Sequence, residues 1–321
     1  MSLPTFSLST TAEEVADVFQ AEIQGKNVLV TGTSLSGLGF ETARTIAKYA
    51  NLVIITGYNA ERLKLSKAAI EENLPSANIR CLTLDLSSLA AVRKAAAEVN
   101  AYSEPLHVLI HNAATAFGPF KLTVDNLENL IATNHVGPFL LTKLLAPKLL
   151  DARTPRYTPR VIFVSSASQT MITGIDFGAM MHPDAATYKS FETYGQTKSA
   201  NSLTAIELSR RSGGRLNAYS LDPGIIMTKA YEKGNVSEQM KVFGVLDAEG
   251  QPNTKDFQWK TIPQGAATTV TAAFDTRLND KPGAYLLDCV VAELPPHSSD
   301  PANAEKLWTV TEEIIGEKFT F

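Results

Sequence analysis

Residues 28–39 read Val28-Leu29-Val30-Thr31-Gly32-Thr33-Ser34-Leu35-Ser36-Gly37-Leu38-Gly39, and a helical pattern follows over residues 41–49. Glycines let a chain turn tightly and approach a pyrophosphate closely, and a helix N-terminus offers N–H groups and positive potential to an anion. A strand, a glycine-rich turn and a helix in this order form the context that a dinucleotide fingerprint requires. We therefore predict a phosphate-binding loop, with contacts from Gly32, Thr33, Ser34, Ser36, Gly37, Leu38 and Gly39.

Beyond this loop, short apolar runs alternate with helical patterns. The runs cover residues 28–30, 52–55, 79–84, 108–110, 161–164, 216–221 and 285–287, and the helical patterns include residues 41–49, 86–99 and 126–150. Short continuous apolar runs are typical of strands buried on both faces, and their alternation with helices implies βαβ crossovers. We predict an α/β protein with a doubly wound parallel sheet, a Rossmann fold, whose ligands bind beyond the carboxyl ends of the strands.

The first 25 residues are interpreted as a helical extension that precedes a single domain over residues 26–321. Thr11 and Glu14 have the spacing of a capping box. The residues that form one apolar helical face after this cap are Val15, Val18, Phe19 and Ile23.

Composition excludes several classes of protein. Apolar residues make up 44% and charged residues 19%, which is typical of a folded chain with a sizeable core. The 29 Lys and Arg against 33 Asp and Glu give a net charge of -4, which disfavours nucleic-acid binding. No apolar run reaches the roughly 18 residues of a membrane span, and the two cysteines do not indicate a disulfide framework. We expect a cytoplasmic protein.

Three further motifs follow the glycine loop in order: Val164-Ser165-Ser166, Tyr194-Gly195-Gln196-Thr197-Lys198 and Asp222-Pro223-Gly224. Together the four motifs resemble those of the short-chain dehydrogenase/reductase family, and most closely the branch with retinol-dehydrogenase-like and WW-domain-oxidoreductase-like members. The resemblance extends from Lys26 to the end of the chain. It implies an NAD(P)-dependent oxidoreductase, an alcohol dehydrogenase or carbonyl reductase that interconverts an alcohol and its ketone or aldehyde.

The motifs also predict the catalytic residues. Tyr194 and Lys198 are four apart on a predicted helix, so their side chains share a face. A free tyrosine has a pKa of about 10, and a nearby lysine cation lowers it, which suits Tyr194 to general acid/base work. The resemblance implies that Lys198 also bonds the nicotinamide ribose. It further implies that Ser166 holds the substrate oxygen and that Asn134 holds a water linking Lys198 to solvent.

Cofactor preference depends on the end of the second predicted strand. Gly57 stands where NAD users of the family carry Asp, so the carboxylate that repels a 2′-phosphate is missing and we favour NADP over NAD. Tyr58 stands where many NADP users carry Arg, so the preference is expected to be modest. The candidate phosphate donors are Thr33, Ser34, Ser36, Asn59 and Arg62. The resemblance implies further cofactor contacts from Tyr58, Asn59, Asp85, Leu86, Asn112, Ala113, Lys198, Pro223, Gly224, Ile226 and Thr228.

Two features depart from the family pattern. Four residues separate Gly32 from Gly37 where the family commonly has three, and 28 positions separate Ser166 from Tyr194, about double the common spacing. The inserted residues 171–193 are apolar and contain methionines, and residues 228–261 are long for a loop. We interpret both segments as substrate loops around a hydrophobic small molecule. Core or subunit packing is the alternative for the first segment, and an ordinary surface insertion for the second.

Two other functions remain as alternatives. A catalytically silent dinucleotide sensor or scaffold is disfavoured by the complete set of Ser166, Tyr194, Lys198 and Asn134. A nucleotide-sugar epimerase or dehydratase is disfavoured because no large separate C-terminal substrate domain follows. His107 and His111 lie in a strand pattern without a third ligand nearby, so no metal site is predicted. The family often pairs through its middle helices, which makes a homodimer a candidate assembly.

Overall fold

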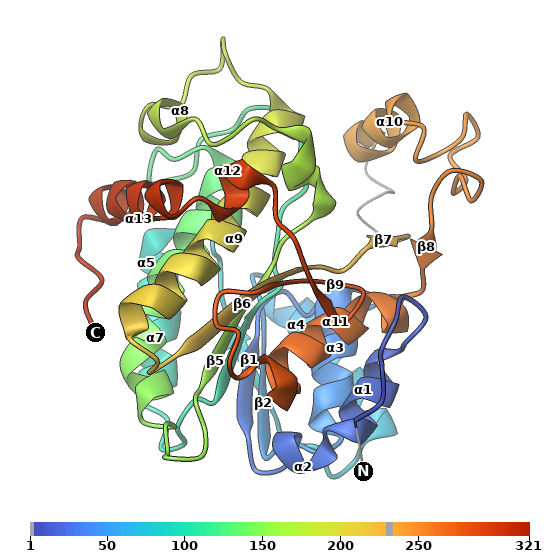
Figure 1. Cartoon of the computed structure of the whole chain (residues 1–321), viewed down its shortest axis with the longest axis vertical. Helices are drawn as coiled ribbons and strands as arrows, with labels where there is room; N and C mark the ends of the chain where they lie inside the picture. Colours follow the sequence, from blue (N-terminus) through green and yellow to red (C-terminus); the bar gives the residue numbers. More distant parts are fainter. Residues whose placement is uncertain (1–2, 229–233) are drawn as a thin grey trace.

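A computed structural model describes residues 3–228 and 234–321, and within them an eight-stranded sheet carries helices on both faces (Figure 1). The strands of this sheet are β1 (Asn27–Val30), β2 (Leu52–Gly57), β3 (Ile79–Thr83), β4 (Val108–His111), β5 (Arg160–Val164), β6 (Asn217–Asp222), β9 (Tyr285–Leu287) and β10 (Val290–Ala292). All are parallel except β10, which pairs antiparallel with β9. The predicted doubly wound α/β fold is confirmed.

The strand order β10-β9-β6-β5-β4-β1-β2-β3 places a switch point between β1 and β4. The chain builds the sheet outward from β1 to β3 in one direction and from β4 to β6 in the other. In doubly wound sheets, ligands bind at such a point, outside the carboxyl ends of the strands. The glycine loop leaves β1 at this point, and Asn112 follows β4 beside it.

Two helical layers cover the sheet. One face carries α3 (Leu38–Ala47), α4 (Ala60–Asn73) and α11 (Ile262–Phe274), and the other carries α5 (Leu89–Asn100), α7 (Gly137–Leu150) and α9 (Ser190–Ser212). Successive residues of a strand pack against opposite helical layers. Val28 and Val30 belong to one apolar cluster and Leu29 to the other. This two-sided burial explains why the strands are continuous apolar runs.

The remaining elements connect or extend these layers. They are α1 (Ala12–Val18), α2 (Gln20–Ile23), α6 (Asn129–Ile131), the π-helical turn η1 (Ala132–Val136), η2 (Ala167–Met171), α8 (Phe177–Met181), β7 (Ile225–Ile226), α10 (Gly234–Val242), β8 (Trp259–Lys260), η4 (Thr276–Leu278), α12 (Pro296–Ser299) and α13 (Pro301–Ile315). In Figure 1, α8 and α10 stand on the two sides of the end to which the parallel strands point.

The N-terminal residues pack onto the domain. The predicted capping box is present, since Thr11 accepts from the Glu14 N–H and the Glu14 side chain accepts from the Thr11 N–H. α1 packs against α11, and Val15 and Phe19 are buried there. The prediction for Val18 was wrong, because the helix ends at this residue and its side chain is 37% exposed.

Candidate active site

The glycine loop packs tightly against the end of β4. Gly32 has φ +72°, and a Cβ there would lie 2.7 Å from the Cα of Ala113. A Cβ on Gly39 would lie 2.3 Å from Nδ2 of Asn112 and 2.4 Å from the carbonyl oxygen of Gly32. Asn112 Nδ2 donates to the carbonyls of Thr31 and Gly32 at 3.0 Å each. These contacts require glycine at both positions and hold the loop at the switch point of the sheet.

The segment between Gly32 and Gly37 has an exposed tip. Ser34 and Ser36 are exposed, Ser36 has φ +62°, and the Gly37 N–H donates to the Ser34 carbonyl at 3.1 Å. Gly37 is the N-cap of α3 and contributes no side-chain hydrogen bond, so first-turn N–H groups are left for an anion. Thr33 differs from the two serines, since it is buried and its hydroxyl donates to the Thr56 carbonyl at 3.1 Å.

The predicted adenosine contacts lie along the ends of β2 and β3. Tyr58 is 70% exposed, and Asn59 caps α4 by accepting the Arg62 N–H at 3.0 Å. Asp85 is exposed and accepts from the N–H and hydroxyl of Ser87, while Leu86 is buried. At Gly57 a Cβ would meet only Leu63, at 3.9 Å, so a side chain fits at this position.

Lys198 links α9 to the end of β5. Its buried Nζ donates to the Val164 carbonyl at 3.0 Å and lies 5.4 Å from the centre of the Tyr194 ring. The backbone carbonyl of Lys198 accepts from the Ser165 hydroxyl at 2.7 Å. Two hydrogen bonds therefore fix the strand end that carries Ser166 beside the helix that carries Tyr194 and Lys198. Ser166 is half-buried and its hydroxyl accepts from the Ser168 N–H at 3.2 Å.

Asn134 lies in the π-helical turn η1 and is buried. Its Oδ1 accepts from the Thr115 N–H at 2.8 Å, and its Nδ2 donates to the Thr115 carbonyl at 3.0 Å and the Thr197 hydroxyl at 3.2 Å. The side chain therefore joins the loop after β4 to α9 one residue before Lys198. π-Helical turns inside helices frequently mark functional sites. A water bound at Asn134 would have to donate to its Oδ1 or bond its main chain, because both amide N–H groups have partners.

Asp222 connects the segment after Ser166 to the Pro223-Gly224 turn. Its carboxylate is buried and accepts from the Ala167 N–H at 3.1 Å and the Gly224 N–H at 2.9 Å. Burial raises the pKa of Asp222, while these N–H groups and the Lys260 cation lower it. In the sequence, Asp222 stands out only as part of the Asp222-Pro223-Gly224 motif. Its position as a buried carboxylate beside the segment after Ser166 could not be predicted from sequence, because its burial arises only in the fold.

Burial also governs the charge of Lys198. Removal from solvent lowers the pKa of Lys198 to about 8, and the negative charge of Asp222 opposes that shift. At neutral pH the lysine is therefore mostly a cation. A positive charge next to the Tyr194 ring stabilises the phenolate form of Tyr194, in which the hydroxyl has lost its proton.

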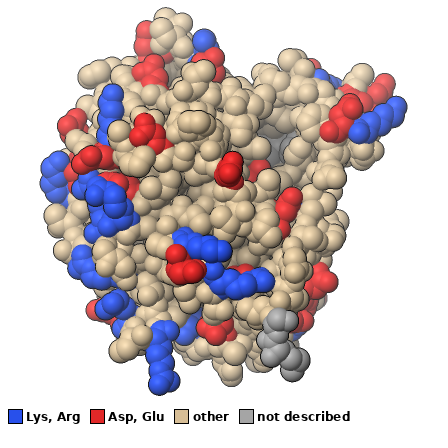
Figure 2. Space-filling model, in the orientation of Figure 1, with Lys and Arg blue, Asp and Glu red and all other residues tan. Residues whose placement is uncertain are grey.

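A row of aromatic rings begins beside Tyr194. The Phe117 ring lies 5.6 Å from Tyr194 and 5.7 Å from Phe191, and Phe243 lies 4.5 Å from Phe191. We call Phe117, Phe191 and Phe243 the aromatic wall. Phe191 comes from the segment 171–193 and Phe243 from the segment 228–261, of which residues 229–233 lie outside the described part. Figure 2 shows a hollow between the lobe that carries α10 and the rest of this face.

The apolar residues earlier in the insert do not join this wall. Met180 is buried in the apolar cluster on the side of the sheet that carries α5, α7 and α9, and Ile175 and Phe177 pack against the same cluster. Ile172 packs on Gly195, where a Cβ would lie 2.7 Å from Cγ2 of the isoleucine. For these residues the packing favours the alternative of core packing, while the substrate role of the segment stays a prediction.

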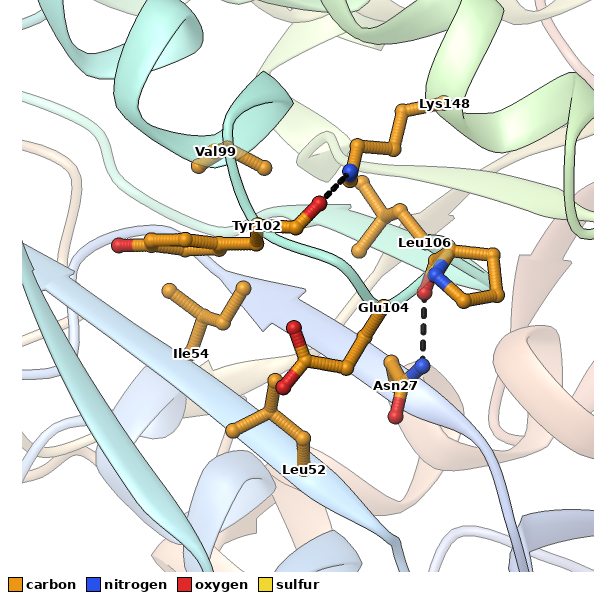
Figure 3. A pocket seen from close by; sticks show the side chains of 9 residues that line it. Asn27, Leu52, Ile54, Val99, Tyr102, Glu104, Leu106 and Lys148 are labelled. Atoms are coloured by element: carbon orange, nitrogen blue, oxygen red, sulfur yellow. Dashed lines mark hydrogen bonds between the residues drawn. The ribbon is translucent and has the colours of Figure 1, made fainter.

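A small pocket at the opposite end of the sheet is not part of this site. Figure 3 shows Asn27 and Leu52, at the starts of β1 and β2, beside Tyr102 and Lys148. Asn27 Nδ2 donates to the Pro105 carbonyl at 2.7 Å, and Lys148 donates to the Tyr102 carbonyl. The cavity holds about 10 Å³, roughly the space of one water molecule.

Known proteins resemble this chain over most of its length. The family model described as short chain dehydrogenase matches residues 26–175. Short-chain dehydrogenase TIC 32 A, chloroplastic, from Brassica napus is 35% identical over 97% of this chain and 94% of its own length. The human WW domain-containing oxidoreductase is 34% identical over 97% of this chain and 72% of its own length.

The chain belongs to the short-chain dehydrogenase/reductase family. The crystal structure of an uncharacterized protein from Mycobacterium Paratuberculosis superimposes with a TM-score of 0.69 and 26% identity, covering 94% of this chain and 98% of that one. The predicted family, including its WW-domain-oxidoreductase-like branch, is confirmed. The general function, an NAD(P)-binding oxidoreductase, is confirmed as well. Members of the short-chain dehydrogenase/reductase family are oxidoreductases that bind NAD(P) and act on small molecules.

The two neighbouring histidines of this short-chain dehydrogenase/reductase belong to its core. His107 Nδ1 accepts from the Asn27 N–H at 3.1 Å, and His111 Nε2 shares a 2.7 Å hydrogen bond with the Thr142 hydroxyl. Burial lowers the pKa of His107 to about 4 and that of His111 to about 3. Across the described ranges, no helix combines the length and apolarity needed to cross a membrane.

Substitution of Gly39 by alanine is expected to weaken cofactor binding by about tenfold to a hundredfold. The new Cβ meets backbone and a hydrogen-bonded amide, and such overpacking costs about 1–3 kcal/mol. Isothermal titration with NADPH measures the change. Gly37→Ala is the matched control, because its Cβ meets only the Ser34 carbonyl, at 3.1 Å, and the loss should be smaller. Equal affinity in Gly39→Ala and the unmodified protein would contradict this account of the loop.

Proposed function

We propose that this chain is an NADP-preferring oxidoreductase that interconverts a hydrophobic alcohol and its ketone or aldehyde. The observation that carries the proposal is the placement of Lys198, bonded to the end of β5 and next to the Tyr194 ring. A tyrosine beside a buried cation is equipped to exchange a proton with a substrate oxygen. The glycine loop fits a dinucleotide, because its backbone cradle at Gly32 and Gly39 has no room for a Cβ.

The chain's own residues handle the proton and the substrate oxygen. In carbonyl reduction, Tyr194 donates its hydroxyl proton to the carbonyl oxygen, and the Lys198 cation stabilises the tyrosine oxygen that results. The Ser166 hydroxyl donates to the same substrate oxygen and orients it. Lys198 and the N–H groups at the start of α3 would hold the cofactor, whose nicotinamide supplies or accepts the hydride. Asn134 acts as a positioning residue through Thr115 and Thr197.

The aromatic wall supports an apolar substrate. Phe117, Phe191 and Phe243 bring rings from three separate segments to the Tyr194 side of α9. Rings of this kind exclude water from a bound carbonyl and contact an apolar body. A panel of aldehydes and ketones of rising apolar size, followed by NADPH oxidation, tests this proposal. Stable NADPH binding without turnover on the whole panel would favour the silent sensor instead.

A cytoplasmic location and a homodimer remain proposals. The Brassica napus relative is described as chloroplastic, so cell fractionation of the source organism decides the location. Sedimentation of the purified chain decides between a monomer and a pair.

The cofactor preference is tested by Gly57→Asp. The position has room for a side chain, and a carboxylate there would accept from a ribose 2′-hydroxyl and repel a 2′-phosphate. We expect kcat/KM with NADPH to fall by at least about tenfold while kcat/KM with NADH is kept or rises. Gly57→Asn is the neutral control of the same size. A clear NADH advantage in the unmodified protein would show that the vacant carboxylate position does not set the preference.

The activity of carbonyl reduction is expected to fall as pH rises through about 8. Lys198 is charged below its lowered pKa of about 8 and loses its charge above it, so the support for the Tyr194 oxygen disappears. Asp222→Asn removes a negative charge that raises the pKa of Lys198, so the midpoint should move to lower pH. The pH profile of kcat/KM measures both effects. Asp176→Asn, at the start of α8, is the control, and an unchanged midpoint in Asp222→Asn would refute the assignment.

A further inference from the structure

A second cavity lies on the far side of α9 from the proposed active site. It encloses about 280 Å³ between α6, the inserted segment with α8, and the first turns of α9. That volume is close to the lower end of cavities that bind small molecules, about 300 Å³. None of Ser166, Tyr194 and Lys198 lines it. We call it the rear cavity.

The geometry of α9 separates the two sites. Glu192, Thr193 and Gln196 line the rear cavity. Because residues advance by about 100° around a helix, Tyr194 and Lys198 point to the opposite side from these three. Figure 1 places α8 on one side of the upper end of the molecule and α10, which leads to Phe243, on the other. A ligand of the rear cavity would therefore not occupy the hydride-transfer site.

Glu128 gives the rear cavity a buried polar group. Its side chain is only 4% exposed, and its Oε2 accepts from the N–H groups of Leu130 and Ile131 at 2.9 and 3.0 Å. Its Oε1 is buried and has no hydrogen-bond partner within 3.5 Å among the residues that the structure describes, although the Tyr188 hydroxyl lies near the carboxylate. Burial raises the pKa of Glu128, which the N–H groups of Leu130 and Ile131 and the Tyr188 hydroxyl oppose. A buried carboxylate oxygen without a donor is costly, so a donor from a ligand would stabilise it.

The rest of the lining is aromatic, apolar and acidic. The Phe120 and Tyr188 rings pack edge to face at 5.3 Å, and Ile131 and Met180 add apolar surface. The Tyr188 hydroxyl donates to the Gly118 carbonyl at 3.1 Å.

Charge in the lining is predominantly negative. Besides Glu128 it includes the carboxylates of Asp176, Asp184 and Glu192. Lys189 is the one cation among the lining residues, and its Nζ is paired with Glu192 at 3.0 Å. A cavity with carboxylates and aromatic faces favours a positive group, since both attract cations.

We propose that the rear cavity binds an organic cation with an apolar body, an amine whose ammonium group donates to Oε1 of Glu128. The body of the amine lies against Phe120, Tyr188 and Met180. This site is separate from the hydride-transfer site, and amine binding there does not depend on catalytic turnover.

The test is binding of 2-phenylethylamine, compared with the uncharged phenylacetamide, by isothermal titration and ligand-observed NMR. The amine should bind the full chain, and the amide at least about tenfold more weakly. Glu128→Gln keeps an acceptor for the Leu130 and Ile131 N–H groups but turns an NH₂ group toward the cavity. It should weaken amine binding by at least about tenfold.

Two further variants locate the site. Tyr194→Phe alters only the hydride-transfer site, so it should bind the amine as the unmodified chain does. Ala179→Phe adds volume to the lining and should block the amine, which keeps the test decisive if Glu128→Gln unfolds in a thermal-melt control. No binding of the amine, equal binding of the amide, or loss of binding in Tyr194→Phe would each overturn the proposal.

Discussion

Tyr194→Phe is expected to lower kcat by about a thousandfold, because a positioned general acid or base contributes on the order of 10²–10⁴. Only the hydroxyl that exchanges the proton is removed. The ring still packs against Phe117 at the position held by α9, so affinity for NADPH should stay within about twofold.

Steady-state kinetics and NADPH titration on the same preparation measure both quantities. Tyr188→Phe is the matched control, since Tyr188 is also near the start of α9 but bonds Gly118, away from Lys198. Turnover in Tyr194→Phe close to that of the unmodified protein would remove Tyr194 from the mechanism.

Lys198→Met is expected to lower both kcat and cofactor affinity, each by at least about tenfold. Methionine fills the buried space but removes the cation beside Tyr194 and the donor proposed for the ribose hydroxyls. Loss of an interaction made by both ground and transition states raises KM, and loss of one made only in the transition state lowers kcat. A variant with two lost roles should therefore show both changes.

The control experiment for Lys198→Met checks that the variant is folded. The lysine Nζ donates to the Val164 carbonyl, so near-ultraviolet circular dichroism and thermal unfolding must show that β5 and α9 remain packed. A lower kcat with unchanged NADPH affinity would support the proposed effect of Lys198 on Tyr194. It would contradict the proposed role of Lys198 in holding the cofactor.

The sheet could be predicted from sequence because its strands are buried on both faces and therefore form continuous apolar runs. Runs such as residues 28–30 and 161–164 lie within β1 and β5. The two-residue strands β7 and β8 were missed, since a pair of residues such as Ile225 and Ile226 carries no periodicity. The π-helical turn at Asn134 was also missed, because it interrupts a pattern that reads as one helix over residues 126–150.

Within the site, motif order placed residues more accurately than composition did. Ser166, Tyr194 and Lys198 come from motifs, and the hydrogen bonds of Lys198 bring their two elements together. The segment 171–193 was interpreted from its apolar content, which cannot distinguish a substrate wall from the core packing of Met180. Asp222 and Glu128 depend on burial, which arises from distant segments that meet only in the fold.

The most direct test of the central claim is transfer of label from NADPH deuterated at the reactive carbon. The unmodified chain, in excess over the labelled cofactor, is mixed with each carbonyl of the panel in a single turnover. The account predicts deuterium on the alcohol carbon of at least one apolar product and none from Tyr194→Phe under the same conditions. Absence of deuterium from every alcohol product, with the label at either of the two positions of the reactive carbon, or transfer to the same extent in Tyr194→Phe, would contradict it.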